Sequence, residues 1–280
     1  MFNKLSTSIG LKFFQTRKPL ELIMFDLLYK KFFLKKKNND FIYNYDQFGF
    51  VKIKPNISEE IDIINNNLKI NDKVKKPPFD FIINSEIDKA IKDIINLRLK
   101  NCISQLEKYF NAKILPAVIN LKRNTFYEKM GDLDERYSDN FHNDAYTLTH
   151  FKIFINLTNV SENQGPMHIV SKKKTKDFLN KINYKDRGKY NHNFFDEDLI
   201  YVNTGSKYEA LIFDPTQCFH RATIPEQSLH RDYLTITFVG LPKNSKIKNI
   251  NYFNYENNEF LKFSKPKGFF NSIKNLIKYF

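Results

Sequence analysis

The chain has 280 residues, of which 41% are hydrophobic and 15% aromatic, enough to fill a core and to exclude wholesale disorder. This length suits one large domain with appendages, because a single β-barrel domain commonly fills about 200 residues, and two catalytic domains are not expected. With only two cysteines, Cys102 and Cys218, the chain has neither a disulfide framework nor a zinc-binding pattern, so we expect a cytoplasmic protein.

The formal net charge of +14 is concentrated at the two ends of the chain. Residues 1–40 hold nine Lys/Arg and three Asp/Glu, and residues 241–280 hold eight Lys and two Glu. Basic ends favour an anionic surface or partner, although the abundance of Lys and Asn is also typical of AT-rich coding. We predict a basic N-terminal extension (1–40), one main domain (41–240) and a basic amphipathic C-terminal extension (241–280).

An apolar segment at residues 20–34 is too short to span a membrane, since a transmembrane helix needs about twenty apolar residues. Asp26, Lys30 and Lys31 also interrupt it. No small-residue cleavage pattern follows the segment, so we do not expect a secretory signal.

The next part of the chain predicts a strand and two helices. Residues 41–54 are rich in aromatic and β-branched residues, and we expect a strand region there. A helix should follow, with Ser58 as its N-cap and acidic residues in its first turn. In residues 85–110 apolar residues recur at helical spacing, which predicts one long packing helix with Ser85 and Asp88 in a capping box.

From residue 114 to residue 239 the pattern changes to short β-rich runs separated by polar turns. This pattern is typical of a barrel or jelly roll, so we predict a mainly β fold with flanking helices. Residues 184–198, rich in Lys, Asn, Tyr and Asp, predict a long loop of the kind that often forms a lid.

His142, Asn143 and Asp144 form an H-x-D pattern that predicts part of a metal site. In an extended segment residues i and i+2 point the same way, so His142 and Asp144 can reach one metal while Asn143 points away. A third ligand would come from a distant strand, and His220 follows an apolar run with a Pro turn signal. Two imidazoles and one carboxylate suit a ferrous ion that keeps other positions open for a co-substrate and dioxygen.

Arg231 lies directly before a β-branched and aromatic strand pattern at residues 233–239. A guanidinium there can hold a carboxylate with two parallel hydrogen bonds, which Lys cannot reproduce. The alternatives are a surface ion pair of Arg231 with Asp232 or with a loop acid, and a loop His with a turn-forming Asp at 142 and 144.

Two other imidazoles compete for the metal. His150 would share a face with Asp144 on a continuous strand, and we expect it to be structural. His168 follows a Gly-Pro turn and could face the cavity and touch the substrate. Polar groups that could assist a co-substrate or substrate precede the H-x-D pattern: Lys122, Asn124, Thr125 and Tyr127.

Over about residues 41–240 the chain resembles the phytanoyl-CoA dioxygenase family of iron(II)- and 2-oxoglutarate-dependent oxygenases. The segments that carry the resemblance are Phe48–Ile53 followed by Ile57–Glu60, the H-x-D pattern, Phe151–Val160, Glu162–His168, and Phe219–Ala222 with Arg231 and Asp232. Where the family usually has Pro-Gly-Ser-His after the Gly-Pro turn, this chain has Val170 and then Ser171–Lys174, so the local turn is expected to differ.

The resemblance implies a double-stranded β-helix, with Fe(II) ligated by His142, Asp144 and His220. It also implies that Arg231 pairs with the distal carboxylate of 2-oxoglutarate and that dioxygen is the second co-substrate. Relatives that transfer halide lack the carboxylate ligand, so the presence of Asp144 implies hydroxylation or a related oxidation. The expected substrate is an unidentified small or lipid-like molecule, and nucleic acid is not an expected partner.

The alternative is a non-catalytic jelly-roll module that binds an anionic surface or polymer through its basic ends. In the C-terminal extension five apolar residues recur at helical spacing, with Lys274 and Lys278 on the other side: Phe269, Ile273, Leu276, Ile277 and Phe280. This pattern favours peripheral contact with an anionic membrane, and packing onto the barrel explains it equally well.

Overall fold

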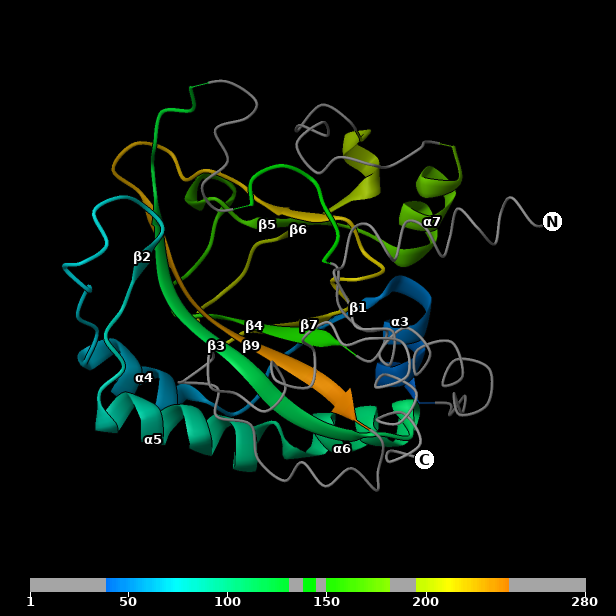
Figure 1. Ribbon diagram of the computed structural model, residues 1–280, viewed down its shortest axis with the longest axis horizontal. Helices are drawn as coiled ribbons and strands as arrows, with labels where there is room; N and C mark the ends of the chain where they lie inside the picture. Colours follow the sequence, from blue (N-terminus) through cyan, green and yellow to red (C-terminus); the bar gives the residue numbers. More distant parts are fainter. Residues whose placement is uncertain (1–38, 131–137, 145–149, 182–194, 242–280) are drawn as a thin grey trace, which may run out of the picture.

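The computed structural model describes residues 39–130, 138–144, 150–181 and 195–241, which form two antiparallel β-sheets with helices on the outer face of the larger one (Figure 1). The six-stranded sheet has the order β1 (Phe50–Ile53), β7 (Ala210–Phe213), β4 (Phe151–Asn156), β9 (His230–Leu241), β3 (Lys113–Thr125) and β2 (Phe79–Asp80). The three-stranded sheet has the order β6 (Ile200–Asn203), β5 (Met167–Val170) and β8 (His220–Ala222). The predicted mainly β, jelly-roll architecture is confirmed.

The pleat of the large sheet separates a helix-covered core from the space between the sheets. On β4, Phe151, Ile153 and Ile155 are buried against the helices, whereas Lys152 and Phe154 point to the other side. Phe154 packs there with Met167 and other apolar residues of the small sheet. The space between the sheets is therefore apolar at one part and bears charged side chains at another.

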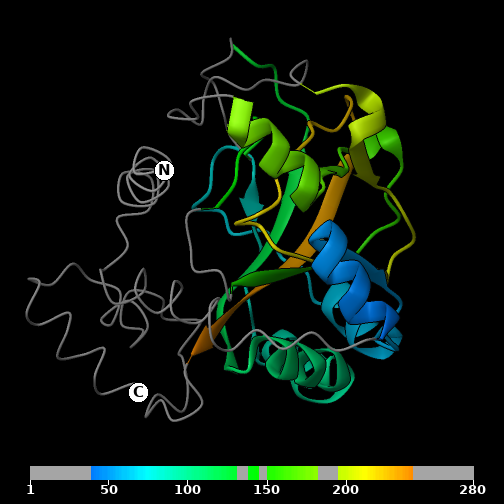
Figure 2. The same cartoon turned by 90° about the vertical axis from the view of Figure 1, so that its right-hand side faces the viewer.

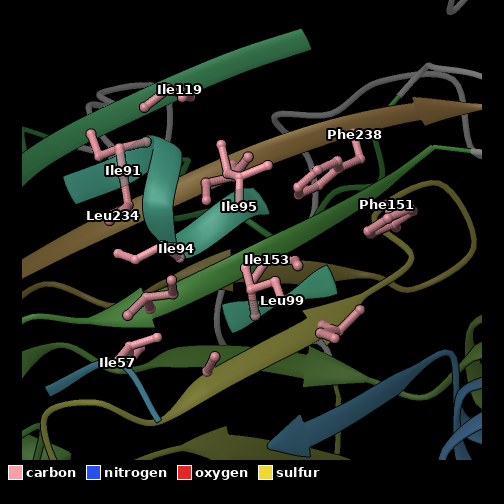
Figure 3. Close-up of a cluster of buried hydrophobic side chains, with 14 of the residues drawn as sticks. Ile57, Ile91, Ile94, Ile95, Leu99, Ile119, Phe151, Ile153, Leu234 and Phe238 are labelled. Atoms are coloured by element: carbon pink, nitrogen blue, oxygen red, sulfur yellow. The ribbon is translucent and has the colours of Figure 1, made fainter. Parts of the chain in front are cut away.

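Three helical segments cover the outer face of the large sheet (Figures 1 and 2): α4 (Ser58–Asn66), α5 (Ser85–Asp93) and α6 (Lys100–Phe110). Isoleucines on their inner faces contact Ile153, Leu234 and Phe238 of the sheet (Figure 3). Each fully buried side chain of this size stabilises the fold by about 1.5–3 kcal/mol. The layer supports β3, β4 and β9, the strands that carry residues of the cavity described below.

The predicted long helix over 85–110 is interrupted. A π-helical turn, η1 (Ile94–Arg98), joins α5 to α6, so the single continuous helix was wrong, although its buried face was predicted correctly. The predicted cap was also wrong by one residue, because the side chain of Asn84 accepts the hydrogen bond from the Ile87 amide. At the start of α4 the N-cap position belongs to Ile57, and Ser58 is the first helical residue.

The strand expected over 41–54 is a helix for most of its length. Helix α3 (Asp40–Phe48) begins because the Asn39 side chain accepts from the Ile42 amide, and it ends at Gly49, whose φ is 79°. Ile42 and Tyr45 form its buried face, a helical spacing that the aromatic content of the segment concealed. Only β1 retains the predicted extended conformation.

The segment that departs from the family pattern forms a helix, α7 (Lys172–Lys181), directly after β5. Before β5, Gly165 has a φ of 71°, and a Cβ there would lie 2.6 Å from the Thr223 carbonyl oxygen, so this turn needs glycine. The turn follows a short 3-10 helix, η2 (Glu162–Gln164), and a similar one, η5 (Glu197–Leu199), precedes β6.

Both predicted basic extensions lie almost wholly outside the described residues, as does most of the predicted 184–198 loop. Within the part of the chain that is described, no helix is long and apolar enough to cross a membrane.

Candidate metal centre

His142 lies beside His220, the first residue of strand β8 in the small sheet. Their backbones form an isolated antiparallel bridge, with hydrogen bonds of 3.1 Å from the His142 amide and 2.8 Å from the His220 amide. Cross-strand partners project to the same side of a sheet, and the two ring centroids are 4.4 Å apart. Two imidazoles that are 78 positions apart in the chain are thereby brought together. The sequence predicted this proximity only through the resemblance to a known family.

The backbone also fixes the orientation of each imidazole. His142 Nδ1 lies 2.8 Å from the Asn140 carbonyl oxygen, and His220 Nδ1 lies 3.1 Å from that of Cys218. A carbonyl oxygen can only accept, so each Nδ1 donates and the lone pair of the neutral ring is on Nε2. Both Nε2 atoms face Asp144. The tautomer with its lone pair on Nε2 is the one that a metal ligand at this position requires.

Asp144 completes a compact donor set. Its Oδ1 lies 3.7 Å from His142 Nε2 and 3.9 Å from His220 Nε2, and one ligand atom of each residue lies within 4.8 Å of the others. Burial alone would raise the pKa of Asp144, but the charge of Lys152, joined by those of His220 and His142 when these rings are protonated, outweighs it and holds that pKa well below the usual range. The carboxylate is thus ionised and able to bind a cation.

Lys152 is a site residue that the sequence analysis missed. Its Nζ lies 2.5 Å from Asp144 Oδ2, the oxygen that does not face the imidazoles. The signal available in the sequence was its position on β4, where Lys152 alternates with buried Phe151 and Ile153 and so must face the space between the sheets.

Arg231 lies within β9 and is 1% exposed. Its guanidinium carbon is 5.3 Å from the ring centroid of Phe154 and 5.2 Å from that of Tyr233, which limits its orientation. The expected alternative, an ion pair with Asp232, is wrong, because Asp232 lies on the other face of β9 and pairs with Arg123.

Asn124 lies opposite Arg231 in the β3–β9 register and is fully buried. Its Oδ1 accepts from the Tyr233 hydroxyl at 3.3 Å, whereas its Nδ2 has no hydrogen-bond partner among the residues that the structure describes. A buried amide donor without a partner costs about 1–3 kcal/mol, so this donor next to a buried guanidinium indicates a place for an acidic ligand. Burial raises the pKa of Tyr233 to about 12, which keeps its hydroxyl a donor.

A cavity of about 250 Å³ joins these residues. His142, Asp144 and His220 line it together with Arg231 and Lys152. Other lining residues include Asn120 and Lys122 from β3, Tyr233 and Thr235 from β9, and the apolar side chains of Phe154, Met167 and Phe213. The cavity therefore combines a metal-type donor set, cations and an apolar wall.

The other candidate residues are not part of the donor set. His150 is buried and outside the cluster of ligand atoms, although its charge also lowers the pKa of Asp144. His168 contacts Arg221, whose Nη2 lies 3.1 Å from His168 Nδ1. Burial and the charges of Arg221 and Arg231 lower the pKa of His168 to about 4. Tyr127 donates to Asp139, and Lys122, although it lines the cavity, pairs with Asp80 at 3.2 Å.

No protein-family model matches the chain, and no curated protein matches it significantly. Among solved structures it is similar to EctD from S. alaskensis with 2-oxoglutarate and 5-hydroxyectoine, with 10% identity, a TM-score of 0.50, and coverage of 74% of this chain and 79% of that one. HygX from Streptomyces hygroscopicus, with nickel and 2-oxoglutarate bound, gives 12% identity, a TM-score of 0.48, and coverage of 73% and 87%. The epimerase SnoN from nogalamycin biosynthesis gives 9% identity, a TM-score of 0.47, and coverage of 73% and 85%.

The similarity to EctD shows the fold: the chain is a double-stranded β-helix of the cupin type. At such low identity the similarity extends to the fold alone. The resemblance to the phytanoyl-CoA dioxygenase family stays a prediction.

Proposed function

We propose that the protein is an iron(II)- and 2-oxoglutarate-dependent oxygenase. The observation that carries this proposal is the group of His142, Asp144 and His220 on the wall of a cavity that Arg231 also lines. Two imidazoles with Nε2 directed inward and one ionised carboxylate are the ligand set of non-haem ferrous oxygenases. The co-substrate proposed here, 2-oxoglutarate, is bound in the solved structures of EctD and HygX.

The described residues fit 2-oxoglutarate as well as the metal. Arg231 would hold the distal carboxylate with two parallel hydrogen bonds, a geometry that suits a planar guanidinium packed against the stacked rings of Phe154 and Tyr233. Asn124 Nδ2 would donate a third hydrogen bond, because Tyr233 holds the amide oxygen and so leaves the nitrogen for the ligand. A carboxylate bound there would accept hydrogen bonds from both side chains and would compensate the buried Asn124 donor.

When bound, iron(II) and 2-oxoglutarate supply the oxidising chemistry, in which dioxygen converts the co-substrate to succinate and carbon dioxide. The chain contributes the ligands, the orientation of the co-substrate and a wall that limits water. Phe154, Met167 and Phe213 form that wall. Exclusion of water strengthens the interaction of Arg231 with a carboxylate and protects reactive species from side reactions.

We further propose that the reaction is the hydroxylation of a C–H bond of a small or lipid-like molecule, and that the chain is a divergent member of the phytanoyl-CoA dioxygenase family. The carboxylate of Asp144 supports hydroxylation, since it fills the ligand position that halide-transferring relatives of that family leave open. The mixed polar and apolar lining of the cavity supports a small organic substrate.

The experiment is an anaerobic titration of the purified protein with ferrous iron and then 2-oxoglutarate. The chelated complex should produce a visible charge-transfer band, and admission of air should release succinate. A protein that gives neither band nor succinate would instead be a non-catalytic jelly-roll module. Omission of iron is the matched control for succinate release.

A further inference from the structure

The two oxygens of the Asp144 carboxylate have different neighbours. Oδ1 faces both imidazoles at 3.7 and 3.9 Å, and Oδ2 is held by Lys152 Nζ at 2.5 Å. A carboxylate can bind a metal through one oxygen or through both, and here the second oxygen is already engaged by a cation.

Asp144 also differs from the two histidines in how it is supported. Each imidazole is oriented by a carbonyl group of its own backbone segment, at Asn140 and at Cys218. Asp144 has a backbone hydrogen bond from its amide to the Pro215 carbonyl oxygen at 2.7 Å, but the orientation of its carboxylate depends on a side chain from another strand.

Lys152 is well placed to provide that support. It lies on β4, an interior strand that pairs with β7 on one side and β9 on the other, with Phe213 and Thr237 as its register partners. The backbone of Lys152 is therefore fixed from both sides. Groups that hydrogen-bond to metal ligands orient those ligands and often change metal affinity about 10–100-fold when mutated.

We propose that Lys152 is a positioning residue that restricts Asp144 to binding the metal through Oδ1 alone. This inference rests on the proposed function in assigning the three ligands to a metal. Its consequence concerns the open positions. A six-coordinate ion bound by two imidazole nitrogens and one carboxylate oxygen keeps three positions open, whereas a bidentate Asp144 would leave two, too few for a chelating co-substrate and dioxygen together.

A different role for Lys152 predicts the opposite change in metal affinity when its charge is removed. If Lys152 were only a counter-ion for Asp144, it would repel a divalent cation and compete for the carboxylate, so its removal would strengthen metal binding. If Lys152 only filled space, an apolar side chain of similar length would leave metal binding unchanged.

The experiment compares Co(II) binding by the full-length protein and its Lys152→Met and Lys152→Arg variants, without 2-oxoglutarate, by visible absorption and calorimetry. Met keeps the length and bulk of the side chain and removes the charge, and Arg restores a donor. Lys122→Met is the matched control, because Lys122 lines the same cavity but pairs with Asp80. Circular dichroism checks that each variant is folded.

We expect Lys152→Met to weaken Co(II) binding about 10-fold or more and to alter its absorption spectrum, as a change in coordination requires. Lys152→Arg should restore most of both, and Lys122→Met should match the parent. Unchanged or tighter Co(II) binding in Lys152→Met would overturn the inference, as would a parent protein that binds no Co(II). A parent that binds Co(II) in a Lys152-dependent way but gives no band with iron and 2-oxoglutarate would refute the proposed function alone.

Discussion

Arg123 holds Asp232 with two hydrogen bonds of 2.7 Å, from Nε and Nη2 to the two carboxylate oxygens. The pair joins β3 to β9 at the register position next to the one that brings Asn124 opposite Arg231. It lies on the face of the sheet that is turned away from the cavity, so it stabilises the arrangement of the candidate co-substrate residues without contacting a ligand.

The first prediction concerns this pair. Arg123→Ala would leave Asp232, which is 2% exposed, as a buried charge without its main partner. A fully buried pair would lose about 3–5 kcal/mol, and because Arg123 is partly exposed we expect a loss of about 2–3 kcal/mol in the free energy of unfolding. Urea denaturation would measure the change. A loss below about 0.5 kcal/mol would show that the pair is no stronger than a surface ion pair.

The second prediction concerns the three metal ligands. Ala at 142, 144 or 220 should abolish the charge-transfer band with iron and 2-oxoglutarate, because each change removes one of three donors whose ligand atoms lie within 4.8 Å of one another. His150→Ala is the matched control, since His150 is a nearby buried imidazole outside that cluster. Iron binding equal to the parent in all three ligand variants would show that the metal site is wrongly assigned.

The third prediction concerns Arg231. Arg231→Lys keeps a positive charge but loses the two-pronged hydrogen bond, so 2-oxoglutarate should bind more weakly by about 1–3 kcal/mol while iron affinity is retained. Titration of the charge-transfer band with 2-oxoglutarate gives both values. An unchanged affinity for 2-oxoglutarate would move the carboxylate site to another cation.

The fourth prediction concerns Asn124. Asn124→Asp replaces the buried donor by a carboxylate of similar size opposite Arg231, where it would repel the distal carboxylate of 2-oxoglutarate and compete for the guanidinium. We expect 2-oxoglutarate affinity to fall about 10-fold or more, which corresponds to about 1.4 kcal/mol or more. The same titration measures it, with Asn120→Asp as a control, since Asn120 lines the cavity on the same strand but does not lie opposite Arg231. Equal effects of the two changes would indicate general charge repulsion in place of a specific contact.

The fifth prediction concerns pH. Burial and the neighbouring arginines lower the pKa of His168 to about 4 in the folded protein, against 6.5 for an unperturbed histidine. The unfolded chain therefore binds the proton first, so the contribution of His168 to stability is present above about pH 6.5 and is lost as the pH falls toward 4.

His168→Gln should remove that part of the pH dependence, because Gln can accept from Arg221 and does not titrate. Thermal unfolding between pH 7 and pH 4.5 would measure it, and the melting temperature of the parent should fall more steeply than that of the variant. Parallel curves for the two proteins would contradict the assignment of a depressed pKa to His168.

Local periodicity along the chain was enough to predict part of this structure. The change from helical spacing at residues 85–110 to short β-rich runs after residue 114 predicted the layer of helices and the β-fold. The reason is that buried apolar residues recur about every 3.6 residues in a helix and every second residue in a strand. The two-residue spacing of His142 and Asp144 predicted that both side chains could reach one metal ion, since residues i and i+2 of an extended chain project to the same side.

Which distant residues join His142 and Asp144 depends on how the strands pair in the folded protein. The bridge between His142 and His220, the ion pair of Lys152 with Asp144, and the position of Asn124 opposite Arg231 all arise from strand register. Register is set by which faces of two strands are buried together and by the turns that connect them, and a shift of one residue would reverse every side chain. Local sequence cannot specify that pairing. The alternation on β4 indicates which face of the strand Lys152 occupies, but only the pairing of β4 with β7 and β9 brings Lys152 to Asp144.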